Sequence, residues 1–407
     1  MHHANLLLVA LLALPAAHGA ADPETLPPVP GLEEDSALRL GLANCRLRFV
    51  REKVGAVTFL GGSITQGGAW RQHVCDELTR RFAMTKFTFV NAGISSVDSS
   101  GHAFRFQRDV VAKGVPDLLF VEAAVNDLHN QRRSDEQRLA MEGILRQARR
   151  ANPLLDVVCL HFADTPHTAD YDRGRTPEII ANHEAIAAHY GAPSVNLAHE
   201  VQRRIAAGQM DWRRDFRGVH PSAWGHRLYA QAVRRLFDQA WARPVAPEDQ
   251  PRAHAVPPPL STACYDGGRL APLAAATDLR DCRIVDRWRP GDRAGTRSEF
   301  VNVPALVGET PGAGFALDFD GRAVGLFLTA GPDAGIIEFR IDGGAWQRRV
   351  TFTQWSGGLH LPWVLVLRND LAPGPHRLDL RLTAERNPLA KGTALRVQHL
   401  LVNGPVG

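Results

Sequence analysis

Two different hydrophobic patterns divide the chain. Through residues 54–241, short apolar runs alternate with longer stretches in which apolar residues recur at helical spacing. The short runs predict five buried strands, at 57–60, 87–90, 117–121, 156–162 and 194–197. The stretches between and after them predict helices, at 70–82, 102–112, 134–151, 177–190 and 221–241. This alternation favours a parallel sheet that is covered by helices on both faces.

The pattern changes in the last third of the chain. There the apolar segments are short, often alternate with polar residues, and are separated by Gly, Pro and Asp turns such as 342–344. Such segments are typical of an all-β sandwich, here expected to be jelly-roll-like. The stretch 243–259 holds six prolines and no periodicity, which indicates a linker. The expected divisions are an N-terminal extension (21–45), an α/β domain (46–242), a Pro-rich linker (243–262) and a β-sandwich domain (263–407).

The first twenty residues have the pattern of a secretory signal peptide. They contain no Asp, Glu, Lys or Arg, and an apolar run at 6–14 ends at Pro15. Ala17 and Gly19 then stand at the −3 and −1 positions of a cleavage site. The pattern predicts export, to the periplasm or out of the cell; the alternative is an uncleaved membrane anchor. No later segment reaches about 18 consecutive apolar residues, so no membrane insertion is expected after cleavage.

Composition narrows the function only slightly. The 407 residues carry 47 basic and 43 acidic side chains, a net charge of +4, which is too weak to indicate a nucleic-acid partner. Five cysteines leave at least one thiol unpaired. Cys159 is expected to be a buried thiol, and Cys264 with Cys282 is the favoured pair. No Cys and His spacing is typical of a zinc site, and the sequence implies no metal or organic cofactor.

Four residues with complementary chemistry follow the predicted strands. Ser63, Gly93 and Asn126 come after the first three strands, and His220 stands just before the last helix. Ligands of an open α/β sheet bind at the carboxyl ends of its strands, so these residues are expected to converge. A hydroxyl nucleophile, a base and oxyanion donors are what acyl transfer requires.

In these four blocks the chain resembles the SGNH (GDSL-type) esterases and lipases, over residues 54–241. The resemblance implies a flavodoxin-like, three-layer α/β/α domain with a five-stranded parallel sheet. It also implies that Ser63 is the nucleophile, and that His220 is the general base and then the general acid. The backbone N–H groups of Ser63 and Gly93 and the side-chain amide of Asn126 would form the oxyanion hole.

Two positions depart from the family pattern. Gly62 replaces the Asp that usually precedes the nucleophile, and Arg217 stands three residues before His220, where the family has its acid. Asp215 and Asp211 stand a little further back in the sequence. Either the loop folds so that Asp215 reaches the imidazole, or a backbone carbonyl orients the ring and the enzyme is a Ser–His dyad. Arg217 beside the base would also lower the pKa of His220 through like charge.

Other residues near the strand ends have two interpretations each. Trp70 and Arg71 either line the substrate pocket or, for Trp70, pack in the core. His129 is a candidate for substrate contact, although a satisfied surface or core histidine is the alternative, as for two further histidines, His161 and His167. Asp127 is expected to bond loop N–H groups. The tryptophans of the β-sandwich domain either form a sugar platform or pack in its core: Trp288, Trp346, Trp355 and Trp363.

These features together indicate a secreted carboxylic ester hydrolase that acts through an acyl-enzyme. Export, the appended β-sandwich and the family resemblance imply an acylated carbohydrate as substrate, and O-acetyl groups as what is removed. One alternative is a lipid or general acyl esterase, or an acyltransferase, with the same residues. Another is a catalytically silent glycan-binding protein, for which Arg217 would be the mark.

Overall fold

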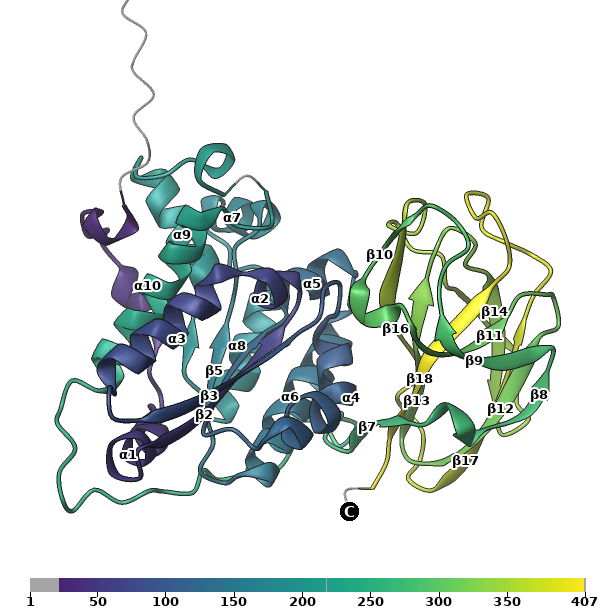
Figure 1. The fold of residues 1–407 in the computed structure, drawn as a ribbon, viewed down its shortest axis with the longest axis horizontal. Coiled ribbons are helices and arrows are strands. Elements are labelled where there is room, and N and C mark those ends of the chain that lie inside the picture. Colours follow the sequence, from purple (N-terminus) through teal and green to yellow (C-terminus); the bar gives the residue numbers. More distant parts are fainter. Residues whose placement is uncertain (1–21, 217, 406–407) are drawn as a thin grey trace, which may run out of the picture.

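The computed structural model describes residues 22–216 and 218–405, which form two domains that lie side by side (Figure 1). The expected signal peptide (1–20) and Arg217 lie outside the described residues. Within the described part of the chain, no helix is both long enough and apolar enough to cross a membrane. The first domain is an α/β unit and the second consists almost entirely of strands.

The α/β domain is built on one six-stranded sheet with the order β1-β6-β5-β4-β2-β3. Its strands are β1 (Ser36–Ala37), β2 (Val54–Gly61), β3 (Lys86–Gly93), β4 (Leu118–Glu122), β5 (Asp156–Leu160) and β6 (Ser194–Val195). Five of them are parallel, and in chain order their arrangement is 2-1-3-4-5, which confirms the expected flavodoxin-like sheet. The short β1 adds an antiparallel edge that the sequence pattern did not predict.

Helices cover both faces of this sheet. They are α1 (Ala43–Arg51), α2 (Ser63–Gly67), α3 (Ala69–Arg81), α4 (Ser99–Asp109), α5 (Ala124–His129), α6 (Ser134–Ala151), α7 (Thr165–Asp172), α8 (Glu178–His189), α9 (Leu197–Ala206) and α10 (Ala223–Ala240). Successive strand residues point to opposite layers: Phe120 packs with α3 and α10, whereas Leu119 and Val121 pack with α4 and α6. Both faces are therefore apolar, as continuous apolar strands require.

The second domain confirms the expected β-sandwich. One sheet contains β7 (Gly268–Ala271), β9 (Cys282–Trp288), β10 (Gly295–Thr296), β11 (Val303–Gly308), β13 (Ala323–Ala330), β16 (Leu359–Arg368) and β18 (Leu395–Asn403). The other contains β8 (Ala276–Arg280), β12 (Gly314–Asp320), β14 (Ile336–Ile341), β15 (Gln347–Val350) and β17 (Pro375–Leu382). Residues such as Leu326 and Val397 from the first sheet and Phe339 and Leu380 from the second share one core.

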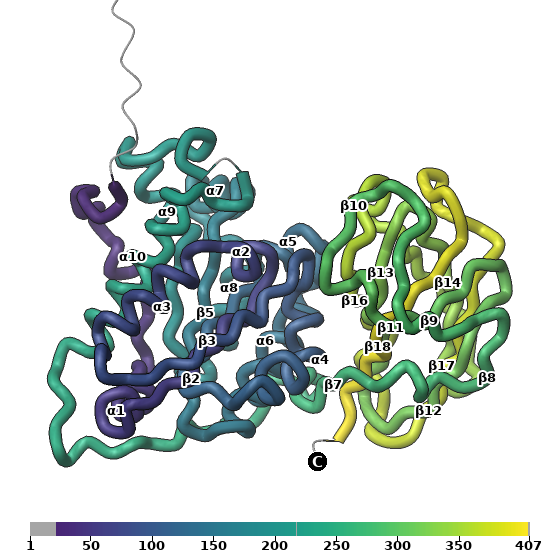
Figure 2. Tube along the Cα trace, viewed as in Figure 1, coloured from purple at the N-terminus to yellow at the C-terminus, as the bar shows by residue number. Residues whose placement is uncertain are grey.

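The two domains are joined through a common apolar cluster. The ring of Tyr265, just before β7, lies 4.9 Å from that of Phe104 of α4 in a tilted arrangement, and Phe327 of β13 belongs to the same buried cluster. Arg132 donates to the Val364 carbonyl across the junction at 2.6 Å. Figure 2 shows the linker running from α10 around the α/β domain to β7, and Arg146 fastens it by donating to the Pro257 carbonyl at 2.8 Å. The junction is thus packed as an interior rather than left as a loose tether.

The expected cysteine pair is absent from the described residues. All five cysteines are free thiols, and Cys159 is fully buried in β5 as predicted. Cys264 is buried in the cluster between the domains, whereas Cys282 packs at the edge of the sandwich core. The two thiols therefore belong to different hydrophobic clusters. The prediction failed because the sequence did not show that residue 264 belongs to the domain junction.

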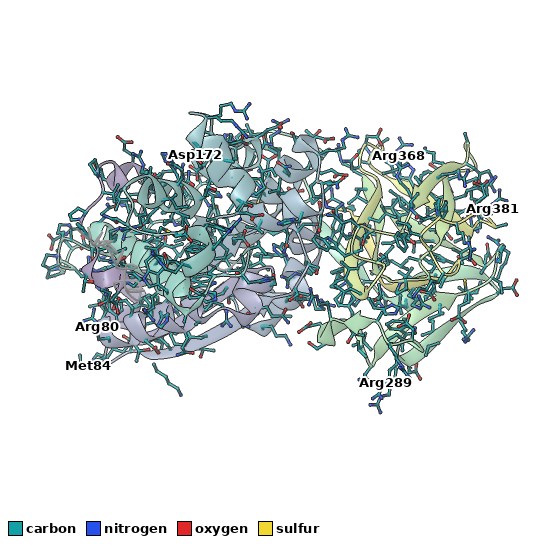
Figure 3. All side chains as sticks on the ribbon, turned by 90° about the horizontal axis from the view of Figure 1, so that it is seen from above. Arg80, Met84, Asp172, Arg289, Arg368 and Arg381 are labelled. Atoms are coloured by element: carbon teal, nitrogen blue, oxygen red, sulfur yellow. The ribbon has the colours of Figure 1, made fainter. Side chains whose placement is uncertain are left out.

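Many of the charged side chains are dispersed over the outside of both domains. Figure 3 labels Arg80 and Asp172 on the α/β domain and Arg289, Arg368 and Arg381 on the β-sandwich, all projecting outward. Arg80 pairs with Glu77 and Arg381 with Glu338, at 2.8 Å in each case. These residues lie far apart in the view and carry local partners, as expected for a solvated surface.

Candidate active site

Ser63 and His220, which are 157 positions apart in the sequence, lie side by side in the folded α/β domain. Ser63 is the first residue of α2, two positions after β2 ends at Gly61. His220 lies in the loop before α10, whose first turn is capped by Ser222. His220 Nε2 lies 2.7 Å from Ser63 Oγ, which is the distance of a strong hydrogen bond. The imidazole is therefore placed to take the seryl proton.

Gly93 and Asn126 lie at the ends of β3 and β4, the two strands that flank β2, so they converge on Ser63 as the sequence predicted. Gly93 must be a glycine because a Cβ there would lie 2.4 Å from the Gln66 backbone nitrogen, so α2 could not approach β3. Its N–H donates to Asn91 Oδ1 at 3.0 Å in this structure. Asn126 donates one amide hydrogen to the Val97 carbonyl at 2.8 Å, which leaves the second hydrogen beside the nucleophile loop.

The departure at Gly62 has a steric explanation. A Cβ at residue 62 would lie only 2.0 Å from Nδ2 of Asn126, so the amide occupies the space that a side chain would need. Glycine at this position lets the Asn126 amide pack directly on the backbone that precedes Ser63. An Asp at this position would hold the Ser63 and Asn126 segments further apart than Gly62 does.

Gln66 is a structural residue of the site that the sequence did not reveal. It lies three residues after Ser63, and its Oε1 accepts from the backbone N–H of Ser95 at 2.8 Å and from the Ser95 hydroxyl. Its Nε2 donates to Glu299 of the β-sandwich domain. Its carbonyl accepts from Asn91 Nδ2 at 2.9 Å. Gln66 thereby ties the nucleophile helix, the loop after Gly93 and the second domain together; its position in the nucleophile helix is the only cue that the sequence offers.

Trp70 packs in the core, and Arg71 bonds the nucleophile helix. Trp70 is 1% exposed, packs edge-on against Phe59 at 5.4 Å, and donates to the Ile64 carbonyl at 3.2 Å. The core interpretation is therefore correct for Trp70. Arg71 is half-buried and donates to the carbonyls of Thr65 and Gln66, which are orphan acceptors at the end of α2. Arg71 therefore stabilises the short nucleophile helix.

Asp215 is not brought to the imidazole. Its carboxylate is buried and accepts two hydrogen bonds from Arg214, at 2.8 and 2.7 Å, and one from the Asp211 backbone at 2.8 Å. Burial raises the pKa of Asp215, but the bonds from Arg214 outweigh it and the pKa lies below its ordinary value. Among the described residues no hydrogen bond joins Asp215 to His220. The reason is local: the π-helical turn Trp212–Phe216 satisfies both carboxylate oxygens within itself.

The second domain contributes one of the charges that set the pKa of His220. Burial lowers the pKa of His220 below its usual 6.5, and the positive charges of Arg297 and His129 lower it further. Arg297 directly precedes the 3₁₀ turn Ser298–Phe300 of the β-sandwich domain. An arginine does act on the base, but the one that the structure describes there is contributed by the other domain. The lowered pKa keeps the imidazole neutral and able to accept a proton at neutral pH.

A second segment of the β-sandwich reaches the site at His129. The Gln354 amide donates to the His129 carbonyl at 2.7 Å, and the Trp355 ring lies 6.1 Å from the imidazole. His129 Nε2 pairs with Asp164 at 2.7 Å, and this bond raises the pKa of His129. Trp355 is 44% exposed, unlike buried Trp288. The other three tryptophans carry arginines on their faces: Arg396 on Trp288, Arg340 and Arg381 on Trp346, and Arg132 on Trp363.

The remaining candidates are structural. His161 is fully buried and pairs with Glu184 at 2.6 Å. His167 is also buried, and burial lowers its pKa to about 4. Asp127 accepts from the Ser99 backbone N–H at 2.9 Å, as expected, and pairs with His183 at 2.8 Å. Asp127 therefore anchors α5, and with it Asn126, to the start of α4.

Comparison with known proteins gives a family match for part of the chain. Residues 59–228 match the model of the GDSL-like Lipase/Acylhydrolase family. No curated protein matches the chain. The crystal structure of a two-domain esterase (CEX) active on acetylated mannans is 20% identical and has a TM-score of 0.72, over 92% of this chain and 99% of that one. A second crystal structure of it, co-crystallized with mannopentaose, gives 21% and 0.71 over 92% and 98%.

Other solved structures match a smaller share of the chain. An acetylxylan esterase from Geobacillus stearothermophilus, Axe2, is 19% identical over 45% of this chain and 93% of its own, with a TM-score of 0.38. The likeness to the two-domain esterase, at 20–21% identity and TM-scores of 0.71–0.72, shows a shared fold. The two-domain likeness therefore shows that the pairing of an α/β domain with a β-rich domain is not peculiar to this chain.

Proposed function

We propose that this member of the GDSL-like lipase/acylhydrolase family removes O-acetyl groups from a polysaccharide or oligosaccharide through an acyl-enzyme on Ser63. Residues 59–228 form its family domain, and the chain is a carboxylic ester hydrolase. The observation that carries the proposed mechanism is the 2.7 Å contact between Ser63 Oγ and His220 Nε2, at the edge of the sheet where ligands bind.

Acylation begins when Ser63 Oγ attacks the acetyl carbonyl carbon and His220 Nε2 takes the hydroxyl proton. The carbonyl oxygen becomes an oxyanion. The second amide hydrogen of Asn126 and the N–H of Ser63, which as the first residue of α2 has no acceptor within the helix, would stabilise it. The N–H of Gly93 would join them once it leaves Asn91. Collapse of the intermediate expels the sugar alkoxide, which receives the proton from His220.

Deacylation repeats the same steps with water. Neutral His220 takes a proton from water, the resulting hydroxide attacks the acetyl carbon on Ser63, and the seryl oxygen leaves with the proton from His220. Acetate is released and the enzyme returns to its starting state. Removal of one oxyanion donor typically lowers turnover by about 10²–10³-fold, which is the loss we expect for Asn126→Ala.

We infer that the base works in a Ser–His dyad. Asp215 is held by Arg214, and the described carboxylate that pairs with a histidine of the site, Asp164, pairs with His129 rather than His220. A dyad requires a base whose neutral form predominates at working pH, and the lowered pKa of His220 provides this.

The carbohydrate substrate is supported by the way in which the second domain meets the site. Glu299 accepts a hydrogen bond from Gln66 of the nucleophile helix, and the charge of Arg297 lowers the pKa of His220. The exposed ring of Trp355 lies beside His129. The site is therefore bounded by both domains, as suits an extended polymer. The two-domain esterase of similar fold is described as active on acetylated mannans, which makes acetylated mannan our first candidate substrate. Export through residues 1–20 stays a prediction.

The experiment compares the full chain with Ser63→Ala on four esters: acetylated mannan, acetylated xylan, p-nitrophenyl acetate and p-nitrophenyl palmitate. We expect acetate release from a polysaccharide and cleavage of p-nitrophenyl acetate, both lost in Ser63→Ala, and mass spectrometry of the wild type should detect a transient acetyl adduct. Preference for palmitate would favour the lipid esterase instead. Equal inactivity of both proteins together with glycan binding would overturn the enzyme and leave the silent glycan-binding protein.

A further inference from the structure

The loop between β3 and α4, residues 94–98, is the support on which the Asn126 amide rests. Three side chains of the segment that begins at Asn126 donate to three consecutive residues of this β3–α4 loop: Asn130 to the Ser96 carbonyl at 3.0 Å, Asn126 to the Val97 carbonyl at 2.8 Å and Arg132 to the Asp98 carboxylate at 2.7 Å. The bond to the Val97 carbonyl uses one of the two amide hydrogens of Asn126. The position of the loop therefore decides where the other hydrogen points.

The backbone at Ser96 shows that this loop does not keep its shape unaided. Its φ is +69°, in the left-handed region that a residue with a Cβ seldom adopts. Such a conformation costs free energy and persists only where surrounding contacts impose it. Asn130 Nδ2 provides two of these contacts, because it donates to the Ser96 carbonyl at 3.0 Å and to the Asp98 carboxylate at 2.7 Å. The β3–α4 loop is therefore held by side chains that follow β4.

The last of the three donors, Arg132, forms a buried ion pair. The side chain of Arg132 is 7% exposed and that of Asp98 is 1% exposed. The same carboxylate caps α4 by accepting from the Gly101 backbone N–H at 3.2 Å. A buried carboxylate that loses its cation is strongly destabilised, so the position of Asp98 depends on that of Arg132. Arg132 therefore fixes the end of the β3–α4 loop together with the start of α4.

The second domain holds the other arm of the same guanidinium group. Arg132 Nη2 donates to the Val364 carbonyl of β16 at 2.6 Å, and the guanidinium carbon lies 5.4 Å from the centre of the Trp363 ring. Gly101 lets β16 approach, because a Cβ there would lie 3.0 Å from a methyl group of Val364. A guanidinium group is planar and rigid, so two acceptors bound to it keep a fixed separation. Arg132 thus ties the β3–α4 loop to the β-sandwich.

We propose that Arg132 is a positioning residue for the oxyanion hole. By bridging Val364 and Asp98, it holds the β3–α4 loop where that loop orients the free amide hydrogen of Asn126 toward the oxyanion. The proposal rests on the proposed function and extends it to the second domain. Arg132 acts through Asn126, because its own bonds go to the loop and to β16 rather than to the reacting atoms. The β-sandwich therefore contributes to catalysis by the way it docks, independently of any glycan that it contacts.

The test measures p-nitrophenyl acetate hydrolysis by the full chain and by Arg132→Lys. Lysine keeps the positive charge beside Asp98 but lacks the fork that joins two acceptors. We expect kcat to fall about tenfold and KM to stay within about twofold of the wild type, because a small displacement of an oxyanion donor is costly. The matched control is Arg146→Lys, which should keep wild-type kcat. Arg146 likewise joins a carboxylate and a carbonyl, those of Asp266 and Pro257, at 2.8 Å each.

A double-mutant cycle with Asn126→Ala separates positioning from a merely structural role. If Arg132 acts through the Asn126 amide, Arg132→Lys should change kcat by less than about twofold once residue 126 is alanine. A structural role would lower kcat by the same factor in both backgrounds, and that result would overturn the proposal. A wild-type kcat in Arg132→Lys would overturn it as well.

A second variant keeps the test decisive if circular dichroism shows that Arg132→Lys is unfolded. Asp98→Asn breaks the same ion pair from its other side and retains a side chain that can cap α4. It should lose kcat by the same factor, and again only while Asn126 is present. Cleavage of p-nitrophenyl acetate by the wild type but not by Ser63→Ala tests the proposed function separately. If that difference is found while Asp98→Asn and Arg132→Lys keep wild-type kcat, the positioning role is wrong and the esterase stands. If it is not found, both proposals are overturned.

Discussion

The nucleophile side and the base side of the site are built in different ways. Ser63 starts a helix of five residues that is held from several directions, by Arg71 at its end, by Asn91 and Ser95 through Gln66, and by Glu299 across the domain junction. His220 lies in a loop, and among the described residues its ring bonds only Ser63. Position is thus fixed on the nucleophile side, whereas on the base side the protonation state is tuned by charges from neighbouring segments.

The largest loss of activity is expected when either partner of the hydrogen bond between Ser63 and His220 is removed. Ser63→Ala and His220→Ala should each lower kcat for p-nitrophenyl acetate by at least about 10⁴-fold, because nucleophile and base act as one unit. For the same reason the double variant should be no slower than either single one. Steady-state kinetics measure this, with circular dichroism as the control for folding. Losses that multiply in the double variant would show that the two residues act independently.

A smaller loss should follow when the support of the nucleophile is removed. Gln66→Leu deletes the bonds to both Ser95 and Glu299, and we expect kcat to fall by about 10²-fold, because small misplacements of reacting groups are costly. Glu299→Ala removes only the contact between the domains, so its loss should be near tenfold, with Glu309→Ala on the outer surface as the matched control. A change in KM alone, with kcat retained, would show that Gln66 binds substrate and does not position Ser63.

The sequence predicts the two sides unequally well. Ser63, Gly93 and Asn126 follow strands whose apolar runs are readable, and the parallel sheet must bring their ends together. Gln66 and Arg297 could not be assigned, because their roles depend on contacts across the domain junction, which leave no local pattern. Trp70 could be assigned to the core or to the pocket, since a buried aromatic and a pocket aromatic look alike at one position in a sequence. The steric reason for Gly62 also needed the Asn126 amide in place.

The base side can be tested through its pH dependence. Arg297→Gln removes a positive charge that lowers the pKa of His220, so this pKa should rise. The acid limb of kcat/KM, which reports the base in the free enzyme, should then move to higher pH by a fraction of a unit, with the rate near about pH 8 unchanged. Arg289→Gln, on the outside of the same domain, is the matched control. An unmoved limb would mean that the charge of Arg297 does not reach the imidazole.

The least effect on turnover is expected at Asp215, the residue that a triad would need most. Because Arg214 and the Asp211 backbone occupy its carboxylate, Asp215→Asn should keep kcat within about threefold of the wild type, whereas removal of a triad acid costs about 10⁴-fold. Stability should respond instead. The pKa of Asp215 is lowered in the folded chain, so its carboxylate stabilises the fold above the unfolded pKa of about 3.9 and ceases to do so as pH falls. Thermal melts should therefore show Asp215→Asn below the wild type near neutral pH, with the gap closing under acid conditions. A collapse of kcat with an unchanged melting temperature would instead make Asp215 the acid of a triad. His220 would then be fixed in position by a side chain, as Ser63 is by the contacts of its helix.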